Sequence, residues 1–159
     1  MAVEIGTGFT AEERGAITAG LTKLLADSYA LYLKTHGYHW NVRGPNFSEL
    51  HELFSTQYTE MWEALDELAE RIRALGEFAP QGYAAFANLT SIRDGDPEKQ
   101  APAMVEELMR DHETVIATAR AALKAAAEDD DVVTEDLITQ RLTAHEKHAW
   151  MLRATLGVK

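Results

Sequence analysis

The placement of proline is the feature of this sequence that most constrains its fold. Proline lacks a backbone donor and clashes with the preceding helical turn, so it confines long α-helices to the stretches between prolines. Four prolines occur in 159 residues, at positions 45, 80, 97 and 102. Between them, apolar residues recur every three or four positions, which predicts amphipathic helices. We therefore expect four long helices of roughly 22 to 33 residues each.

Local signals predict where the first two helices begin and end. Thr10 and Glu13 have the spacing of a capping box, so the first helix is expected to begin there and run to about Val42. Glycine and proline follow at positions 44 and 45 and disfavour continuation of the helix. Asn46 is expected to cap the second helix, which runs to about Leu75.

The second half of the chain predicts two more long helices. They follow a mixed connection at 77–101, in which a short helix is expected at about 83–87. The third long helix is expected to begin between 96 and 102 and to end near Ala127. Thr134 is expected to cap the fourth, which continues through Leu156. The sequence thus predicts one all-α domain over residues 1–159, a four-helix bundle, with 1–9 as a short tail that lacks Lys and Arg.

Composition excludes several classes of function. The chain has 15 Lys and Arg against 26 Asp and Glu, a formal net charge of -11, which disfavours nucleic acid and anionic membranes as partners and favours cations. It has no cysteine, so disulfides, thiolate metal sites and cysteine nucleophiles are excluded. No apolar run approaches the ~20 residues that span a bilayer, and the first residues do not resemble a secretion signal. We expect a cytoplasmic protein without a membrane partner.

Metal binding is the chemistry that the motifs favour. Neither a nucleophile elbow nor a glycine-rich phosphate loop is present. A di-iron site inside one bundle needs Glu-x-x-His on two helices, and no glutamate of this chain has histidine three residues later. The remaining candidates are two histidines at the junction of the first two helices and two carboxylates on the second helix, namely His39, His51, Asp66 and Glu70.

The spacing of these four residues requires a second copy of the chain. Asp66 and Glu70 are one helical turn apart and share a face. His51 lies on the same broad face but 15 residues before Asp66, which is roughly 22 Å along a helix. Two copies of the second helix packed antiparallel across a two-fold axis would bring the histidine of one chain to the carboxylates of the other, giving two equivalent sites.

Simpler interpretations exist for each candidate. Asp66 and Glu70 could form a solvated helix face, with Glu70 paired to Arg73 three residues later. His39, which is followed by Trp40, could be a hydrogen-bonded core histidine.

A longer motif joins these residues. It consists of His39-Trp40-Asn41-Val42-x-Gly44-x-x-Phe47-x-x-Leu50-His51-x-x-Phe54, followed by Asp66-x-x-Ala69-Glu70-Arg71. This pattern closely resembles the signature of the Dps miniferritins, which are ferritin-like four-helix bundles that assemble into dodecameric hollow shells. The resemblance implies a ferroxidase centre at the two-fold interface, with His39 and His51 from one chain and Asp66 and Glu70 from its partner.

The resemblance also implies an activity and its cofactor. Ferrous iron would be oxidised at this centre, preferably by hydrogen peroxide rather than oxygen, and stored as a ferric mineral core inside the homo-dodecamer, which protects against oxidative stress. One position departs from the family, because Ser55 stands where an acidic residue usually follows the second histidine. A hydroxyl is a poor iron ligand beside a carboxylate, so we expect one well-held iron per site and a weaker second one.

The acidic run before the fourth helix is a second candidate for cation handling. It comprises Asp129, Asp130 and Asp131, with Asp136 further on. These residues could be a solvated loop with acids that favour the helix dipole. In Dps shells the matching segment lines a three-fold pore for ferrous ions, and Asp131 and Asp136 are our candidates for that lining.

Other aromatic and histidine residues have plain interpretations. Trp40 and Trp62 are expected to be core aromatics, or alternatively oxidisable rings that absorb stray radicals near the iron. His36 and His112 are expected to be ordinary surface or core residues. His145 and His148 could form an adventitious metal site at the surface.

The competing function is a DNA-compacting shell with weak ferroxidase activity. Relatives that bind DNA strongly usually do so with a lysine-rich tail, which residues 1–9 lack, and the last residues offer only Lys159. A dodecamer would carry a net charge of about −130 and repel a polyanion. We therefore expect no direct DNA binding.

Overall fold

The computed structural model describes residues 5–159, and this part of the chain is entirely helical outside its turns and connections. Four long helices form the bundle: α1 (Ala11–Asn41), α2 (Phe47–Ala74), α4 (Ala101–Glu128) and α5 (Val132–Thr155). A short helix, α3 (Tyr83–Leu89), lies in the connection between α2 and α4. The four-helix bundle with a short central helix is therefore confirmed. Residues 1–4 of the predicted tail lie outside the described residues.

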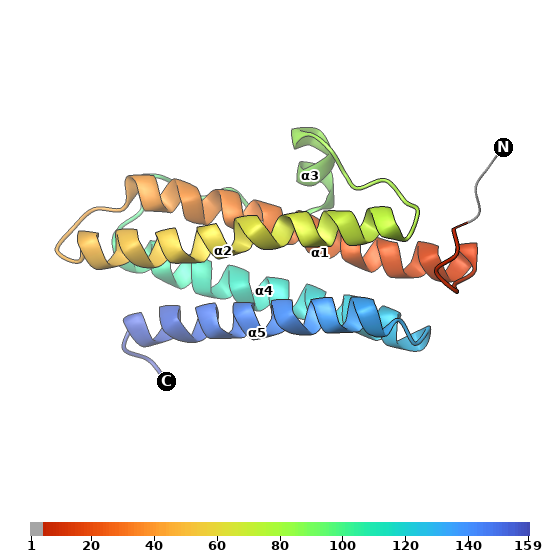
Figure 1. Ribbon diagram of the computed structural model, residues 1–159. Coiled ribbons are helices and arrows are strands. Elements are labelled where there is room, and N and C mark those ends of the chain that lie inside the picture. Colours follow the sequence, from red (N-terminus) through yellow and green to blue (C-terminus); the bar gives the residue numbers. More distant parts are fainter. Residues whose placement is uncertain (1–4) are drawn as a thin grey trace.

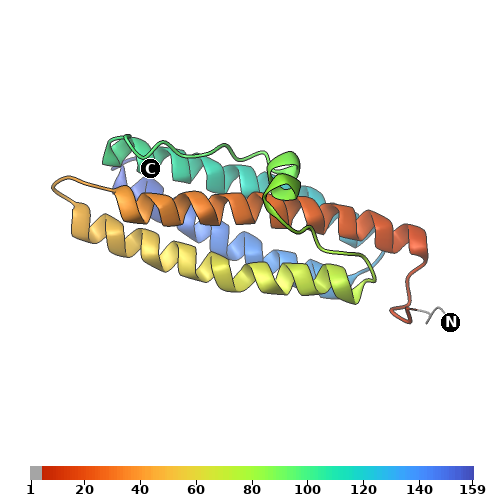
Figure 2. The ribbon, with the colours of Figure 1, turned by 90° about the horizontal axis from the view of Figure 1, so that it is seen from above.

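The connectivity follows from the long crossover. Helices α1 and α2 form one antiparallel hairpin and α4 and α5 form another, and the hairpins pack on each other mainly through α1 and α4 (Figure 1). The connection that carries α3 runs back along the outside of the bundle, so α4 points the same way as α2 (Figures 1 and 2). Helix α3 stands against α1 on the face away from α5 (Figure 1). No helix in residues 5–159 is long and apolar enough to cross a membrane.

The helix starts confirm one predicted cap and correct another. Both arms of the capping box are present at α1, where Thr10 accepts from the Glu13 amide and the Glu13 carboxylate accepts from the Thr10 amide. Asn46 precedes α2 as expected, but its side chain makes no capping hydrogen bond. The N-cap of α5 is Asp131 and not Thr134.

Apolar residues from all four long helices fill the core. The largest fully buried side chains include Leu21 and Leu31 of α1, Phe54 and Met61 of α2, and Leu108 of α4. Helix α1 approaches α4 closely at Gly20, where a Cβ atom would lie 3.1 Å from the Cβ atom of Ala122. The hydrophobic stripes predicted from the sequence therefore meet along the bundle axis.

Asp27 fixes the crossover to the bundle. Its fully buried carboxylate accepts hydrogen bonds from the Ser91 amide at 2.6 Å and from the hydroxyls of Thr90 at 3.0 Å and Thr118 at 2.7 Å. Lys23 pairs with the same carboxylate at 3.0 Å. One buried charge, fully hydrogen-bonded, thus joins α1, α4 and the segment after α3.

Asp131 joins the start of α5 to α2. It is 1% exposed, and both of its oxygens accept from the Arg71 Nη2 atom, at 2.8 and 2.9 Å. The Thr134 amide and hydroxyl donate to the same carboxylate at 3.0 and 2.6 Å. Burial alone would raise the pKa of Asp131, but these hydrogen bonds outweigh it and lower that pKa. The expectation that Asp131 lines a pore is corrected, because its carboxylate is enclosed within one protomer.

Asp131 and Asp136 should therefore differ in their contribution to stability. Asp131→Asn keeps a cap acceptor but leaves the half-buried Arg71 without a counter-charge, and we expect a loss of about 2 kcal/mol in the free energy of unfolding. Asp136 is exposed, so Asp136→Asn should change it by less than about 0.5 kcal/mol. Urea unfolding at pH 7 measures both.

Because the pKa of Asp131 is lowered in the fold, its stabilisation is present above the unfolded-state pKa and is lost as pH falls through the folded value. Equal effects of the two substitutions would contradict this assignment.

Candidate metal centre

The structure brings His39 and His51 together at the junction of α1 and α2. Their rings stack with centroids 3.7 Å apart and an interplanar angle of 20°. The Nδ1 atom of His39 lies 2.8 Å from the carbonyl oxygen of His51, and the Nδ1 atom of His51 lies 2.8 Å from the carbonyl oxygen of His39. A carbonyl oxygen only accepts, so each Nδ1 carries a proton and donates it. In a neutral ring the Nε2 atom then has the free lone pair, which is the state of a metal-ligating histidine whose other nitrogen is held by a carbonyl.

Asp66 and Glu70 lie on α2, like His51, but much further along that helix. Both are exposed on α2, and neither has an ion-pair or hydrogen-bond partner for its carboxylate among residues 5–159. Arg73 lies over the Phe78 ring at 4.4 Å and donates to the Glu77 carbonyl, so the alternative in which it pairs with Glu70 is wrong. Within the described chain, no group of three or more His, Asp and Glu is arranged to hold a metal ion. One protomer thus carries two separated halves of a ligand set.

Ser55 lies one turn after His51 on α2 and is half-buried. Its hydroxyl is in the position at which a carboxylate would extend the histidine half of the ligand set. The chain therefore offers no charged oxygen one turn after His51 on that helix.

Aromatic rings extend from the histidine pair along the α1 and α2 surface. His36 stacks on Tyr58 at 3.9 Å and contacts Trp40 at 4.3 Å, and Tyr32 lies 5.3 Å from Trp62. Trp40 is 63% and Trp62 is 57% exposed. Their interpretation as core aromatics is wrong, because the apolar stripe to which they belong faces outward and away from the bundle axis. Burial, followed by the neighbouring His39, lowers the pKa of His36.

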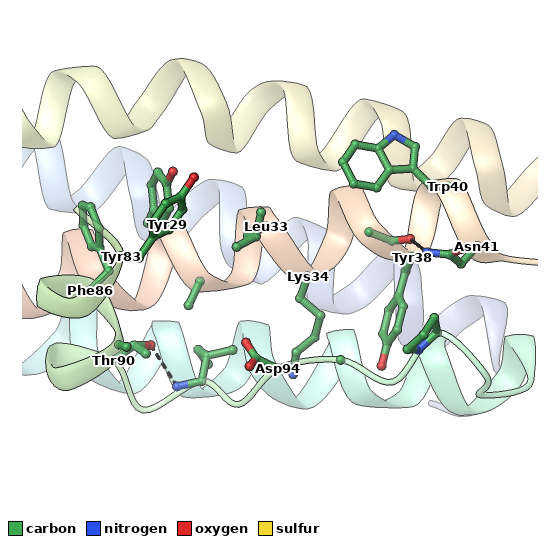
Figure 3. Close-up of a pocket in the computed structure, with 16 residues that line it drawn as sticks. Tyr29, Leu33, Lys34, Tyr38, Trp40, Asn41, Tyr83, Phe86, Thr90 and Asp94 are labelled. Carbon is green, nitrogen blue, oxygen red and sulfur yellow. Dashed lines mark hydrogen bonds between the residues drawn. The ribbon is translucent and has the colours of Figure 1, made fainter. Parts of the chain in front are cut away.

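Two apolar grooves flank α3 on the same surface. The first has a volume of about 560 Å³ and lies between α1, α3 and the segment after α3, with Leu33, Trp40 and Phe86 in its lining (Figure 3). The second has a volume of about 710 Å³ and includes Trp62 and Asp66. Neither groove contains the histidine pair. The surface that carries the carboxylates is therefore apolar and hollowed, which is typical of a surface that binds another protein.

The acidic end of the bundle includes residues that sequence reasoning missed. Burial and the nearby carboxylates of Glu13 and Glu128, with smaller effects from Asp130 and Glu12, raise the pKa of Asp129. The start of α1 thus contributes acids to the same region as the turn before α5. The only sequence signal for this was the Glu pair in the first turn of α1.

Three histidines occupy the bundle core. His112 and His145 are fully buried and His148 is 6% exposed. The interpretation of His145 and His148 as a surface metal site is therefore wrong. Their spacing of three residues on α5 does place them on one face, but that face points inward.

Comparisons with known proteins identify the family. Residues 18–158 match the ferritin-like domain family, described as "Ferritin-like domain". The chain is 40% identical over 137 residues to "DNA protection during starvation protein 2" of Bacillus anthracis, which covers 86% of this chain and 94% of that protein. The crystal structure of a Dps protein from Bacillus brevis has a TM-score of 0.89 and 34% identity, covering 93% of this chain and 99% of that one.

A third comparison concerns the wider superfamily. The Dps protein of Vibrio cholerae O1, described as a member of a broad superfamily of ferritin-like diiron-carboxylate proteins, has a TM-score of 0.91 and 29% identity and covers 98% of each chain. The fold, the histidine pair and these matches agree, and the chain belongs to the Dps family of ferritin-like proteins.

Proposed function

We propose that this protein is a ferroxidase and iron store. Ferrous iron is oxidised at a two-fold interface, where His39 and His51 of one chain meet Asp66 and Glu70 of the partner chain, and the ferric product is mineralised inside a dodecameric shell. The observation that carries the proposal is the stacked histidine pair, because both Nδ1 atoms are held by backbone carbonyls. Its complement, two unpaired carboxylates further along α2, is present on the same chain.

The separation of the two halves supports a shared site. Asp66 follows His51 by 15 positions in helix α2, which corresponds to roughly 22 Å. An antiparallel copy of α2 places the partner's carboxylates beside the histidines and repeats the site by symmetry. The exposed Trp40 and Trp62 and the two grooves beside α3 supply the apolar surface that such an interface buries.

Each ligand type has a distinct chemical task. Neutral imidazole binds ferrous iron without adding charge, whereas the carboxylates offset the positive charge and favour the ferric product. Two ferrous ions each give one electron to hydrogen peroxide, which takes up two protons and leaves as two water molecules. Peroxide is proposed as the oxidant because it accepts both electrons at once without releasing a reduced oxygen radical.

The acidic end of the bundle is proposed as the entry region for ferrous ions. Asp136 is exposed on α5, and within residues 5–159 its carboxylate accepts a hydrogen bond only from Gln140, at 2.8 Å. Asp129 and Asp130 lie at the preceding turn, near the acids that begin α1. Copies of these carboxylates around a three-fold axis would concentrate cations there.

Mixed shells test whether the site is shared. A chain carrying His39→Ala and His51→Ala and a chain carrying Asp66→Ala and Glu70→Ala should each lack ferroxidase activity as a pure assembly. Co-assembled in equal amounts, they should regain about a quarter of the wild-type sites, because half of the interfaces are mixed and each of these has one complete site. Rapid-mixing absorbance after ferrous iron and peroxide measures the activity.

The control is a mixture made without co-assembly, in which pure shells of the two variants are combined after folding. It should stay inactive. Activity in either pure variant, or no recovery in the mixed shell, would contradict a shared site.

Ser55 should limit the second iron position. Anaerobic ferrous titration by calorimetry should show one tightly bound iron per site in the wild type. Ser55→Glu supplies the missing carboxylate and should bring a second iron to comparable affinity, whereas Ser55→Gln is the matched control of similar size and should not. Two tight irons in the wild-type protein would refute the role given to Ser55.

The second candidate function is DNA compaction, which the names of relatives favour. The net charge of -11 per chain opposes it. In a gel-shift assay at low salt we expect no retardation of DNA without divalent cations. Retardation under those conditions would favour a DNA-compacting shell.

A further inference from the structure

A cluster of histidines and an ion pair lies inside the bundle core. It consists of His112 on α4, His145 and His148 on α5, and the ion pair between Glu60 on α2 and Arg141 on α5. The ring centroids of His145 and His148 lie 5.1 and 5.3 Å from that of His112. This cluster is the place where α2, α4 and α5 meet through polar groups, and the proposed iron chemistry does not use it.

The hydrogen bonds of the cluster are incomplete. The Nδ1 atoms of His112 and His145 lie 2.9 Å apart and form one N–H···N hydrogen bond. The Nε2 atoms of both rings are buried without a partner among residues 5–159. His148 bonds Glu60 through Nε2 at 3.2 Å, and its Nδ1 atom also lacks a partner. Gln57, one turn before Glu60, is buried with both amide atoms unpartnered. The polar atoms of this cluster therefore have few protein partners besides one another.

The bond between His112 and His145 depends on their protonation. An N–H···N bond needs one nitrogen with a proton and one with a lone pair. If both rings are protonated, two N–H groups face each other at 2.9 Å and the bond becomes a repulsion. The contact between α4 and α5 at this point therefore exists only while at least one ring is neutral.

Burial is the largest cause that lowers the pKa of both rings. For His112 it is followed by His145 and His148, with Glu60 opposing in part, and for His145 by Arg141 and His148. Arg141 holds both oxygens of Glu60, and these contacts together with His148 outweigh burial and lower the pKa of Glu60 to about 2. Asp111, which precedes His112 on α4, is already paired with Lys34 of α1 at 2.6 Å.

A metal ion does not explain the cluster. Its side chains are not arranged around a common position in residues 5–159. The guanidinium of Arg141 also places a positive charge beside the imidazoles, which disfavours a second cation.

We propose that this cluster is an acid-sensitive latch that holds α5 against α2 and α4. Proton uptake by His112 and His145 breaks their mutual bond and buries two positive charges beside Arg141, so α5 separates from the bundle. The sign follows from linkage: rings that stay neutral in the fold but have the ordinary histidine pKa near 6.5 when unfolded make the unfolded state bind more protons below that pH. The hydrogen bond excludes the second proton of the pair, and one excluded proton raises the unfolding constant about 10-fold per pH unit below pH 6.

The test compares pH dependence in two variants. The double substitution His112→Leu and His145→Leu removes both partners together, so neither ring is left unpaired. Ile138→Val is the control, since it trims a fully buried side chain on α5 without removing a titrating group. Urea unfolding of the whole assembly at fixed concentration, followed by circular dichroism from pH 7.5 to 5, gives the unfolding constants.

We expect the wild type and Ile138→Val to share one pH dependence. The double variant should be less steep, by about 10-fold per pH unit between pH 6 and 5. Equal steepness in all three proteins would overturn the proposal.

A direct measurement covers the case in which the double variant does not fold. Hydrogen exchange at the imidazole C2 positions, read by mass spectrometry, reports the protonation of each histidine in the wild-type shell. At least one of His112 and His145 should remain neutral well below pH 6.5 while the helices persist. Ordinary titration of both rings near pH 6.5 with intact helices would refute the latch.

Discussion

The reciprocal hydrogen bonds between His39 and His51 are the constraint on which the proposed chemistry depends. They tie the last turn of α1 to the first turns of α2 and fix the tautomer of both rings. The same bonds set the distance from the histidines to Asp66 and Glu70, because α2 is a continuous helix from Phe47 to Ala74. A rigid helix cannot fold its carboxylates back, so the proposed ligand set requires a second chain.

The sequence predicted the fold more closely than the environments of individual side chains. Helical periodicity and proline placement located all four long helices, because both act locally and are read within a few turns. The cap of α5 was assigned to Thr134 and is Asp131, which Arg71 reaches from α2 across 60 residues. The cap itself is a local bond from the Thr134 amide, for which Asp is as suitable as Thr, and only the Arg71 partner is set by tertiary packing.

The candidate site shows the same limit. Spacing on one helix identified His51, Asp66 and Glu70 as residues of one face, and it also showed that they do not meet within one chain. It could not show whether that face pointed inward. Trp40 and Trp62 were expected inside and lie outside. For His145 and His148 a surface metal site was one possibility, and both lie inside. An amphipathic pattern with aromatic residues on both sides leaves the buried side undetermined until the neighbouring helices are placed.

The partners of the acids separate structural carboxylates from those available to iron. Asp27 and Asp131 are buried and hydrogen-bonded, and half-buried Glu60 is paired with Arg141. The charges of these carboxylates are therefore neutralised within the protomer. Asp66 and Glu70 are exposed without a partner in the described chain. An unpaired carboxylate pair on an apolar surface is unfavourable to bury unless the partner surface supplies a compensating charge. The surface next to it in the proposed dimer carries the two imidazoles, which as metal ligands supply no positive charge. A ferrous ion provides that charge, so the interface and its cargo are expected to stabilise each other.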